Sequence, residues 1–122
     1  MKYRSKLEER LGNGRLKHLQ YEGMKLDYTQ TKSYIPDFIN NKKKILFEVK
    51  GYFRDSREAR KYVDVKEQYP EWVIVFVFSD PTKPLAWAKK RVGDGKRLTH
   101  GEWADNHGFL YCSEHSIKKE WL

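Results

Sequence analysis

Cysteine is nearly absent from this chain of 122 residues, because Cys112 is its single thiol. One thiol cannot form an internal disulfide, and without further thiols or a paired histidine spacing it does not make a structural zinc site. We expect Cys112 to pack as a small hydrophobic side chain. The histidines also lack the spacing of metal ligands, and we expect all of them at the surface or in loops: His18, His100, His107 and His115.

Long apolar runs are missing as well. No stretch of about 18 apolar residues occurs, and the opening sequence MKYRSKLEER has no apolar signal-peptide core, so we expect a cytoplasmic protein that does not enter a membrane. Acidic residues are in the minority, with 17 Asp and Glu against 25 Lys and Arg, which gives a net charge of +8. This excess favours polyanions such as nucleic acid or anionic lipid, and its sign alone does not separate the two.

The length of the chain fits one domain. A hydrophobic fraction of 39%, with 15% aromatic residues, supplies enough apolar area for one core, so we expect residues 1–122 to form a single domain. The run Trp72–Phe78 reads WVIVFVF. An unbroken β-branched and aromatic run of this kind predicts a strand that is covered on both faces and lies in the middle of a sheet.

Capping residues, turn residues and hydrophobic spacing divide the rest of the chain into short elements. Three capping signatures each predict the start of a helix: Ser5 with Glu8, Asp55 with Glu58, and Thr99 with Glu102. The other predicted elements are a strand at 16–34 that is partly exposed or crosses to a partner, a hairpin with strands at 34–39 and 45–50, and a last strand at 109–112. This order of strands and helices implies an α/β fold in which helices pack against a sheet.

A cluster of charged residues is predicted at the hairpin. Glu48 and Lys50 lie two residues apart in the strand ILFEVK, so both side chains project from the same face. Pairing across the hairpin brings Asp37 close to them. Carboxylate oxygens are the ligands that Mg²⁺ and Mn²⁺ prefer, so Asp37 and Glu48 suit a divalent-metal site. The alternative is a solvated face, because short charged motifs of this kind also occur by chance.

The predicted cluster matches the needs of phosphodiester hydrolysis. A divalent metal stabilises charge on the scissile phosphate and lowers the pKa of a bound water, which makes hydroxide available for in-line attack. Beside two carboxylates the ammonium of Lys50 should stay protonated. We therefore expect Lys50 to stabilise the phosphate or the nucleophile electrostatically and not to act as a general base.

The residues around these positions resemble the signature of the PD-(D/E)xK nuclease superfamily. The matching segments are Ile35-Pro36-Asp37-Phe38 and Phe47-Glu48-Val49-Lys50-Gly51. The sequence also resembles the endonuclease I family of T-odd bacteriophages over most of its length, at Tyr3–Glu8, Lys66–Glu71, Val77–Ser79 and Gly101–Glu102. The resemblance implies a restriction-endonuclease-like mixed β-sheet flanked by helices, and an enzyme that resolves four-way (Holliday) and other branched DNA junctions.

Carried over position by position, the family's active centre corresponds to Glu8, Asp37, Glu48 and Lys50. Spacing alone explains Glu8 as half of a capping box, whereas the resemblance makes it a further ligand of the metal or its water. The resemblance also implies a homodimer with exchanged segments, in which the helix that carries Glu8 completes the partner's site and the two sites make paired nicks. Gly12–Gly14 shortens that first helix, and the family's basic C-terminal extension is absent, which leaves the preference for junctions over nicked or mismatched duplexes open.

Basic side chains in three stretches suit the backbone phosphates of DNA. The candidates are Lys42, Lys43, Lys44, Arg54, Arg57, Arg60, Lys61, Lys89, Lys90 and Arg91. Together these features predict a deoxyribonuclease that depends on Mg²⁺ or Mn²⁺, needs no small-molecule cofactor, and is encoded by a phage or prophage in a bacterial host. Two alternatives stay open: a nicking or restriction-like endonuclease of the same superfamily, or a non-catalytic basic DNA-binding protein.

Overall fold

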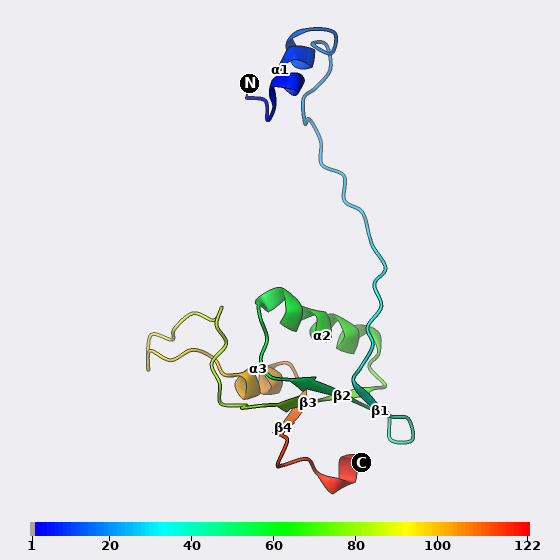
Figure 1. Cartoon of the computed structure of the whole chain (residues 1–122), viewed down its shortest axis with the longest axis vertical. Helices are drawn as coiled ribbons and strands as arrows, with labels where there is room; N and C mark the ends of the chain where they lie inside the picture. Colours follow the sequence, from blue (N-terminus) through cyan, green and yellow to red (C-terminus); the bar gives the residue numbers. More distant parts are fainter. Residues whose placement is uncertain (1) are drawn as a thin grey trace. The chain divides into compact units, whose positions relative to one another are not determined.

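The computed structural model describes residues 2–122 and divides the chain into two compact units (Figure 1). The first unit is Met1–Lys32 and the second is Ser33–Leu122. The predicted single domain therefore consists of a short N-terminal unit and a larger unit that holds the sheet. None of the helices within residues 2–122 has the length and apolar character that a membrane span requires.

The first unit is built around helix α1, Lys6–Asn13. The side-chain oxygen of Ser5 accepts a hydrogen bond from the backbone N–H of Glu8, so the predicted cap is present, and the helix ends at Asn13, followed by Gly14 as its C-terminal cap. The strand predicted at 16–34 is not formed, so that prediction was wrong, although the segment is largely exposed as expected. A strand is held by hydrogen bonds to a neighbouring strand, and none of the strands found within residues 2–122 pairs with the segment.

The second unit is a four-stranded sheet with helices packed against it. The elements are β1 (Phe38–Asn40), β2 (Ile45–Lys50), α2 (Ser56–Gln68), β3 (Val73–Phe78), α3 (His100–Asn106), β4 (Leu110–Ser113) and the 3₁₀ helix η1 (Lys119–Trp121). The strand order is β1-β2-β3-β4, with β1 antiparallel to β2 and the other pairs parallel. This mixed sheet confirms the predicted α/β fold, with β3 in its interior.

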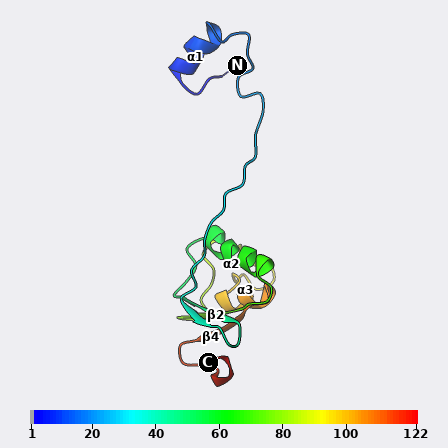
Figure 2. The same ribbon diagram turned by 90° about the vertical axis from the view of Figure 1, so that its right-hand side faces the viewer.

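Alternating residues of β2 and β3 face two separate cores. On one face, Leu46 and Phe76 pack with side chains of α2 and α3, such as Tyr62 and Trp103. On the opposite face, a second cluster contains Trp121 of η1 and five sheet residues, Ile45, Phe47, Val75, Val77 and Cys112. Figure 2 shows α2 and α3 on the same side of the sheet and the C-terminal end on the other. The burial of Cys112 confirms its predicted packing role.

The histidine prediction was wrong at His100, which is only 1% exposed. Its Nε2 accepts a hydrogen bond from the backbone N–H of Phe53 at 3.0 Å, so Nδ1 carries the proton and donates to the carbonyl of Lys83 at 2.7 Å. The imidazole also stacks on the Phe53 ring, with 5.5 Å between centroids. Sequence spacing did not reveal this burial, because the two backbone groups that bind the imidazole, the N–H of Phe53 and the carbonyl of Lys83, are far from His100 in the sequence.

Candidate active site

Asp37 lies immediately before β1, opposite the end of β2. Strand pairing joins Phe38 to Phe47, and continuing this antiparallel register sets Asp37 opposite Glu48. The Oδ2 atom of Asp37 accepts a hydrogen bond from the backbone N–H of Val49 at 2.8 Å. Val49 stands between Glu48 and Lys50, so this bond brings the aspartate to the part of β2 that carries both other predicted residues.

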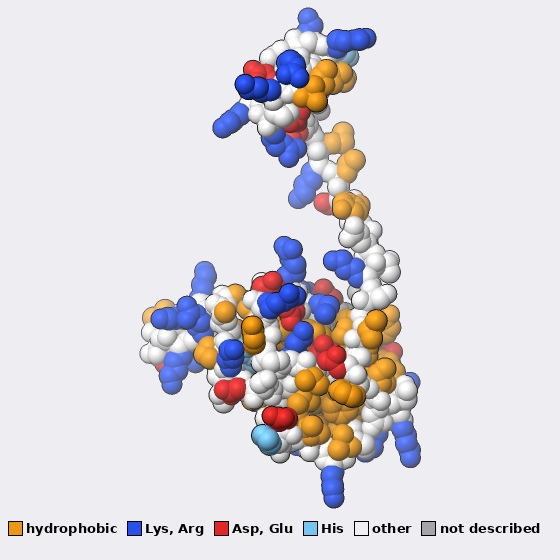
Figure 3. All heavy atoms as spheres, in the orientation of Figure 1, with side chains coloured by type: hydrophobic (Ala, Val, Ile, Leu, Met, Phe, Trp, Pro, Cys, Tyr) orange, Lys and Arg blue, Asp and Glu red, His pale blue; other side chains and the backbone are white. Residues whose placement is uncertain are grey.

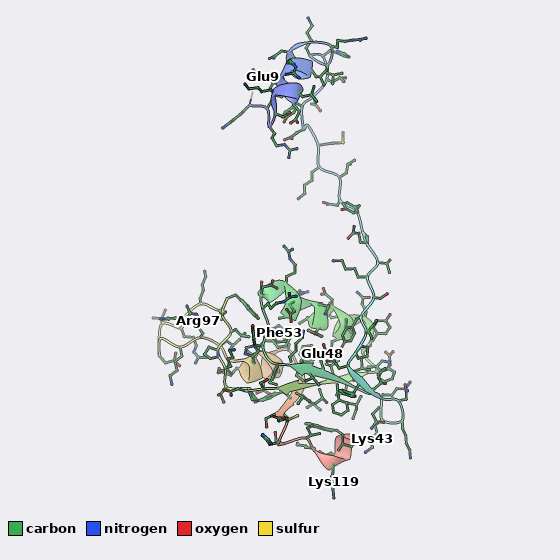
Figure 4. All side chains as sticks on the ribbon, in the orientation of Figure 1. Glu9, Lys43, Glu48, Phe53, Arg97 and Lys119 are labelled. Atoms are coloured by element: carbon green, nitrogen blue, oxygen red, sulfur yellow. The ribbon has the colours of Figure 1, made fainter. Side chains whose placement is uncertain are left out.

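Glu48 is a carboxylate inside the core, with only 6% of its surface exposed. Two tyrosines hold it from the helical side of the sheet: the hydroxyl of Tyr62 donates to Oε1 and the hydroxyl of Tyr34 donates to Oε2, each at 2.8 Å. Burial, and then the hydrogen bond to Glu48, raise the pKa of each phenol well above its ordinary value. Both hydroxyls therefore remain donors to the carboxylate. Figure 4 shows Glu48 between the sheet and α2.

Lys50 projects from the same face as Glu48, as predicted, and is held by Glu58 of α2. Its Nζ lies 2.8 Å from Glu58 Oε1, and the Nε of Arg54 lies 2.8 Å from Glu58 Oε2. Burial alone would raise the pKa of Glu58, but hydrogen bonds from Arg54 and Lys50 outweigh it and lower this pKa to about 2. Glu58 is therefore ionised at neutral pH and forms a bridge between two cations.

Comparison with known proteins identifies the family of this chain. The model of the family described as phage endonuclease I matches residues 1–122. This chain belongs to the phage endonuclease I family. It is 30% identical to Endodeoxyribonuclease 1 of Enterobacteria phage T3 over 92% of this chain and 72% of that protein. It is also 28% identical to Endonuclease I of Escherichia phage T7, over 98% of this chain and 78% of the relative.

The remaining residue of the predicted endonuclease I centre, Glu8, belongs to the first unit of the chain. The hydroxyl of Tyr21 donates a hydrogen bond of 2.8 Å to Glu8 Oε2, and this bond is the main cause of a lowered Glu8 pKa. The capping interaction predicted from the spacing is half formed, because Ser5 accepts from the backbone of Glu8 while the Glu8 carboxylate is directed to Tyr21. The Glu8 side chain is therefore an ionised carboxylate held by a residue of its own unit.

The carboxylates of the second unit have the chemistry that Mg²⁺ or Mn²⁺ requires. A carboxylate presents about four lone-pair positions, and the hydrogen bonds described use one at Asp37 and two at Glu48. Within residues 2–122 of one chain, no three His, Cys, Asp or Glu side chains are grouped closely enough to hold a metal. The donor types thus fit a divalent metal, with further ligands to come from outside this group, such as water or substrate phosphate.

All the basic residues predicted to contact DNA are exposed, but several also have contacts within the protein. Lys43 donates to the backbone carbonyls of Glu120 and Leu122, beside η1 (Figure 4). Arg91 forms ion pairs with Asp94 and Glu102, which brace the loop at 88–97. Figure 3 shows Lys and Arg side chains spread over both units.

Sequence reasoning missed the three residues that hold the site together: Tyr34, Tyr62 and Glu58. Glu58 was assigned to helix capping, and Tyr62 is one of the buried residues of the same helix, a role that its apolar ring also satisfies. One signal was available, because Glu58 and Tyr62 are four residues apart on a helix and Glu48 and Lys50 are two apart on the preceding strand. Four polar side chains at matching spacing on consecutive elements indicate a contact between their faces.

Proposed function

We propose that this chain is a DNA endonuclease that depends on Mg²⁺ or Mn²⁺ and resolves four-way and other branched DNA junctions by paired nicks. The observation that carries the proposal is the hydrogen bond that the backbone N–H of Val49 donates to Asp37, which ties Asp37 to the end of β2 that carries Glu48 and Lys50. Membership of the phage endonuclease I family and the names of the T3 and T7 relatives support nuclease activity on DNA. These phage relatives also support action in the cytoplasm of a bacterial host.

The roles of the residues follow from their chemistry. Asp37 and Glu48 would hold the divalent ion, which supplies charge stabilisation and an activated water when bound. Lys50, with two of its three N–H donors not used by Glu58, would bind the phosphate as negative charge develops there. Tyr34 and Tyr62 fix the orientation of Glu48, in the way that groups around a metal ligand commonly do.

A homodimer with exchanged segments is part of the proposal. Met24, Leu26 and Tyr28 alternate with polar residues, and each exposes at least 75% of its surface. Such a pattern is typical of a strand with one apolar face, and it is left uncovered within this chain. The second unit also exposes apolar side chains, drawn in orange in Figure 3. Phe38 and Ile39 of the edge strand β1 are both exposed. Pairing with a second copy would cover these groups, and the same exchange would bring Glu8 to the partner's carboxylates.

The decisive experiment replaces Asp37 with Asn and measures both cleavage and binding of a four-way junction in Mg²⁺. We expect cleavage to be lost while binding survives, because the substitution removes one metal ligand and leaves the basic surface intact. Lys50→Ala should behave in the same way and remain folded. Full cleavage by Asp37→Asn would refute the assignment of the active site, and binding without cleavage by the unmodified chain would favour the non-catalytic DNA-binding alternative.

Two further measurements separate the finer parts of the proposal. Equal cleavage rates on a four-way junction and on a linear duplex of the same sequence would favour a nicking or restriction-like enzyme. Cleavage should stop when EDTA removes divalent ions and return with added Mg²⁺ or Mn²⁺. The mass in solution should be that of a dimer, and a replacement of Leu26 by Lys should weaken the dimer if the alternating segment lies in the interface.

A further inference from the structure

The carboxylate of Glu58 does not make the interaction that its place in the helix favours. Glu58 is the third residue of α2, after the capping residue Asp55, whose side chain accepts from the backbone N–H of Glu58 at 2.8 Å. A glutamate at this position commonly bonds back to the backbone of the capping residue. Helix α3 has that reciprocal pair, since Glu102 Oε1 accepts from the backbone N–H of Thr99 at 3.0 Å.

In α2 the carboxylate of Glu58 is instead directed to β2, the strand that carries Glu48 and Lys50. Its two oxygens accept from Lys50 and Arg54, and its side chain is only 9% exposed, whereas that of Arg54 is 81% exposed. Lysine has a long side chain with many rotamers, so fixing its ammonium requires a defined partner. The charge-assisted bond of 2.8 Å to Glu58 is such a partner, and it leaves Lys50 two further donors.

The spacing of α2 matches the spacing of β2 at this contact. Glu58 binds Lys50, and Tyr62, four residues later on the helix, binds Glu48, two residues earlier on the strand. Four residues of helix advance by about 6 Å, and two residues of strand by about 6.6 Å. The ammonium of Lys50 also lies 5.9 Å from the centre of the Tyr62 ring. One helix face therefore fixes both the carboxylate and the ammonium of the proposed site.

We propose that Glu58 is a positioning residue that fixes the ammonium of Lys50 relative to Glu48 through the matched contact between α2 and β2. The inference rests on the proposed nuclease function, because it assumes that Lys50 acts on the phosphate. Glu58 itself need not touch DNA or metal. Its contribution is to hold Lys50 in the reactive arrangement, and misplacing a reacting group by about 1 Å can lower a rate by about 100-fold.

The test is a double-mutant cycle on single-turnover cleavage of a four-way junction, with enzyme in excess and Mg²⁺ present. The variants are Glu58→Ala, Lys50→Met and the double variant, and Glu67→Ala, an exposed change on the same helix, is the matched control. We expect Glu58→Ala to lower the rate constant about 10-fold to 100-fold. Junction affinity in Ca²⁺ should stay within about twofold, because the basic surface is unchanged. In the Lys50→Met background the same change should have no further effect.

A second variant keeps the test valid if alanine disturbs folding. Glu58→Gln is close in shape and keeps an oxygen that can accept from Lys50, so it should recover a large part of the rate lost in Glu58→Ala. Equal losses with and without Lys50 would overturn the inference, because Glu58 would then act independently of the lysine. An unchanged rate in Glu58→Ala would also overturn it.

Failure of this inference and failure of the proposed function give different results. If Lys50→Met cleaves as fast as the unmodified chain, the assignment of Lys50 to the active site is wrong, and the inference fails with it. If Lys50→Met keeps only a slow residual rate and Glu58→Ala is fully active, only the positioning role fails. Thermal unfolding of each variant shows whether a lower rate reflects a smaller folded fraction.

Discussion

The hydrogen bond that Tyr62 donates to Glu48 allows us to predict how far its removal lowers the free energy of unfolding. Tyr62 has no exposed surface, and Tyr62→Phe removes a single hydroxyl from the core. Oε1 of Glu48 then loses its donor at 2.8 Å in a place that water does not readily reach. Hydrogen bonds to charged groups contribute about 1.5 to 3 kcal/mol to stability, and the apolar packing of the ring is kept. We therefore expect the free energy of unfolding to fall by about 2 kcal/mol.

The assay is equilibrium unfolding in urea without divalent ions, and Tyr34→Phe is the matched control. Tyr34 makes an equally short bond to the other oxygen of the same carboxylate, but it is only half-buried, so water can replace its hydroxyl. We expect a loss below about 1 kcal/mol for Tyr34→Phe, with the same dependence on urea concentration. A loss at Tyr62 no larger than that at Tyr34 would refute the reasoning, since burial would then not set the cost.

Three further outcomes follow from the structure. The pKa of Glu58 in the folded protein is lowered to about 2 from the ordinary 4.5. The contribution of Glu58 to stability is therefore present above pH 4.5 and is lost as the pH falls towards 2. Glu58→Gln should flatten this part of a curve of unfolding free energy against pH, measured in urea. Gly101→Ala should lower the free energy of unfolding by about 1 to 3 kcal/mol, because its Cβ would lie 2.9 Å from the ring of Tyr111, whereas Gly93→Ala, with open space around it, should change little. His100→Phe should cost about 1 to 3 kcal/mol in the same assay, because it leaves the buried backbone N–H of Phe53 without an acceptor and removes one of the two donors to the carbonyl of Lys83, and an unchanged midpoint would contradict the bonding described.

Much of the second unit could be predicted from the sequence because its signals are local. The run ending at Phe78 gave an interior strand, Asp55 and Thr99 marked helix starts, and the turn after Asn40 gave the hairpin. Each depends on neighbouring residues, whose spacing or capping chemistry is visible in one dimension. The strand prediction at 16–34 was wrong because strand formation depends on more than local signals. Its alternation is real, but a strand also needs a second strand, which a single sequence does not supply.

The candidate site was also predictable only in part, where local sequence signals specify it. Alternation on one strand placed Glu48 and Lys50 on one face, and hairpin pairing brought Asp37 to them. The residues that orient this group, such as Tyr62 and Glu58, come from a helix whose docking depends on the packing of the whole sheet face. The sequence around each of them favours an ordinary structural role, that of a core aromatic residue for Tyr62 and of a capping residue for Glu58. Both assignments are correct as far as they go, and only the packed structure shows the second contact of each side chain.

Position 48 shows why a local conflict can mark a functional site. In β2 and β3 the side chains on the helical face include Leu46, Ile74 and Phe76, so the pattern requires an apolar residue at Glu48. A buried carboxylate is costly for stability unless it is hydrogen-bonded, and here two phenols serve that purpose. Replacing such a polar group by apolar residues is often neutral or stabilising, so stability alone does not account for Glu48. A residue that violates the folding pattern, and is held in place by two others, is better explained by the chemistry of its carboxylate.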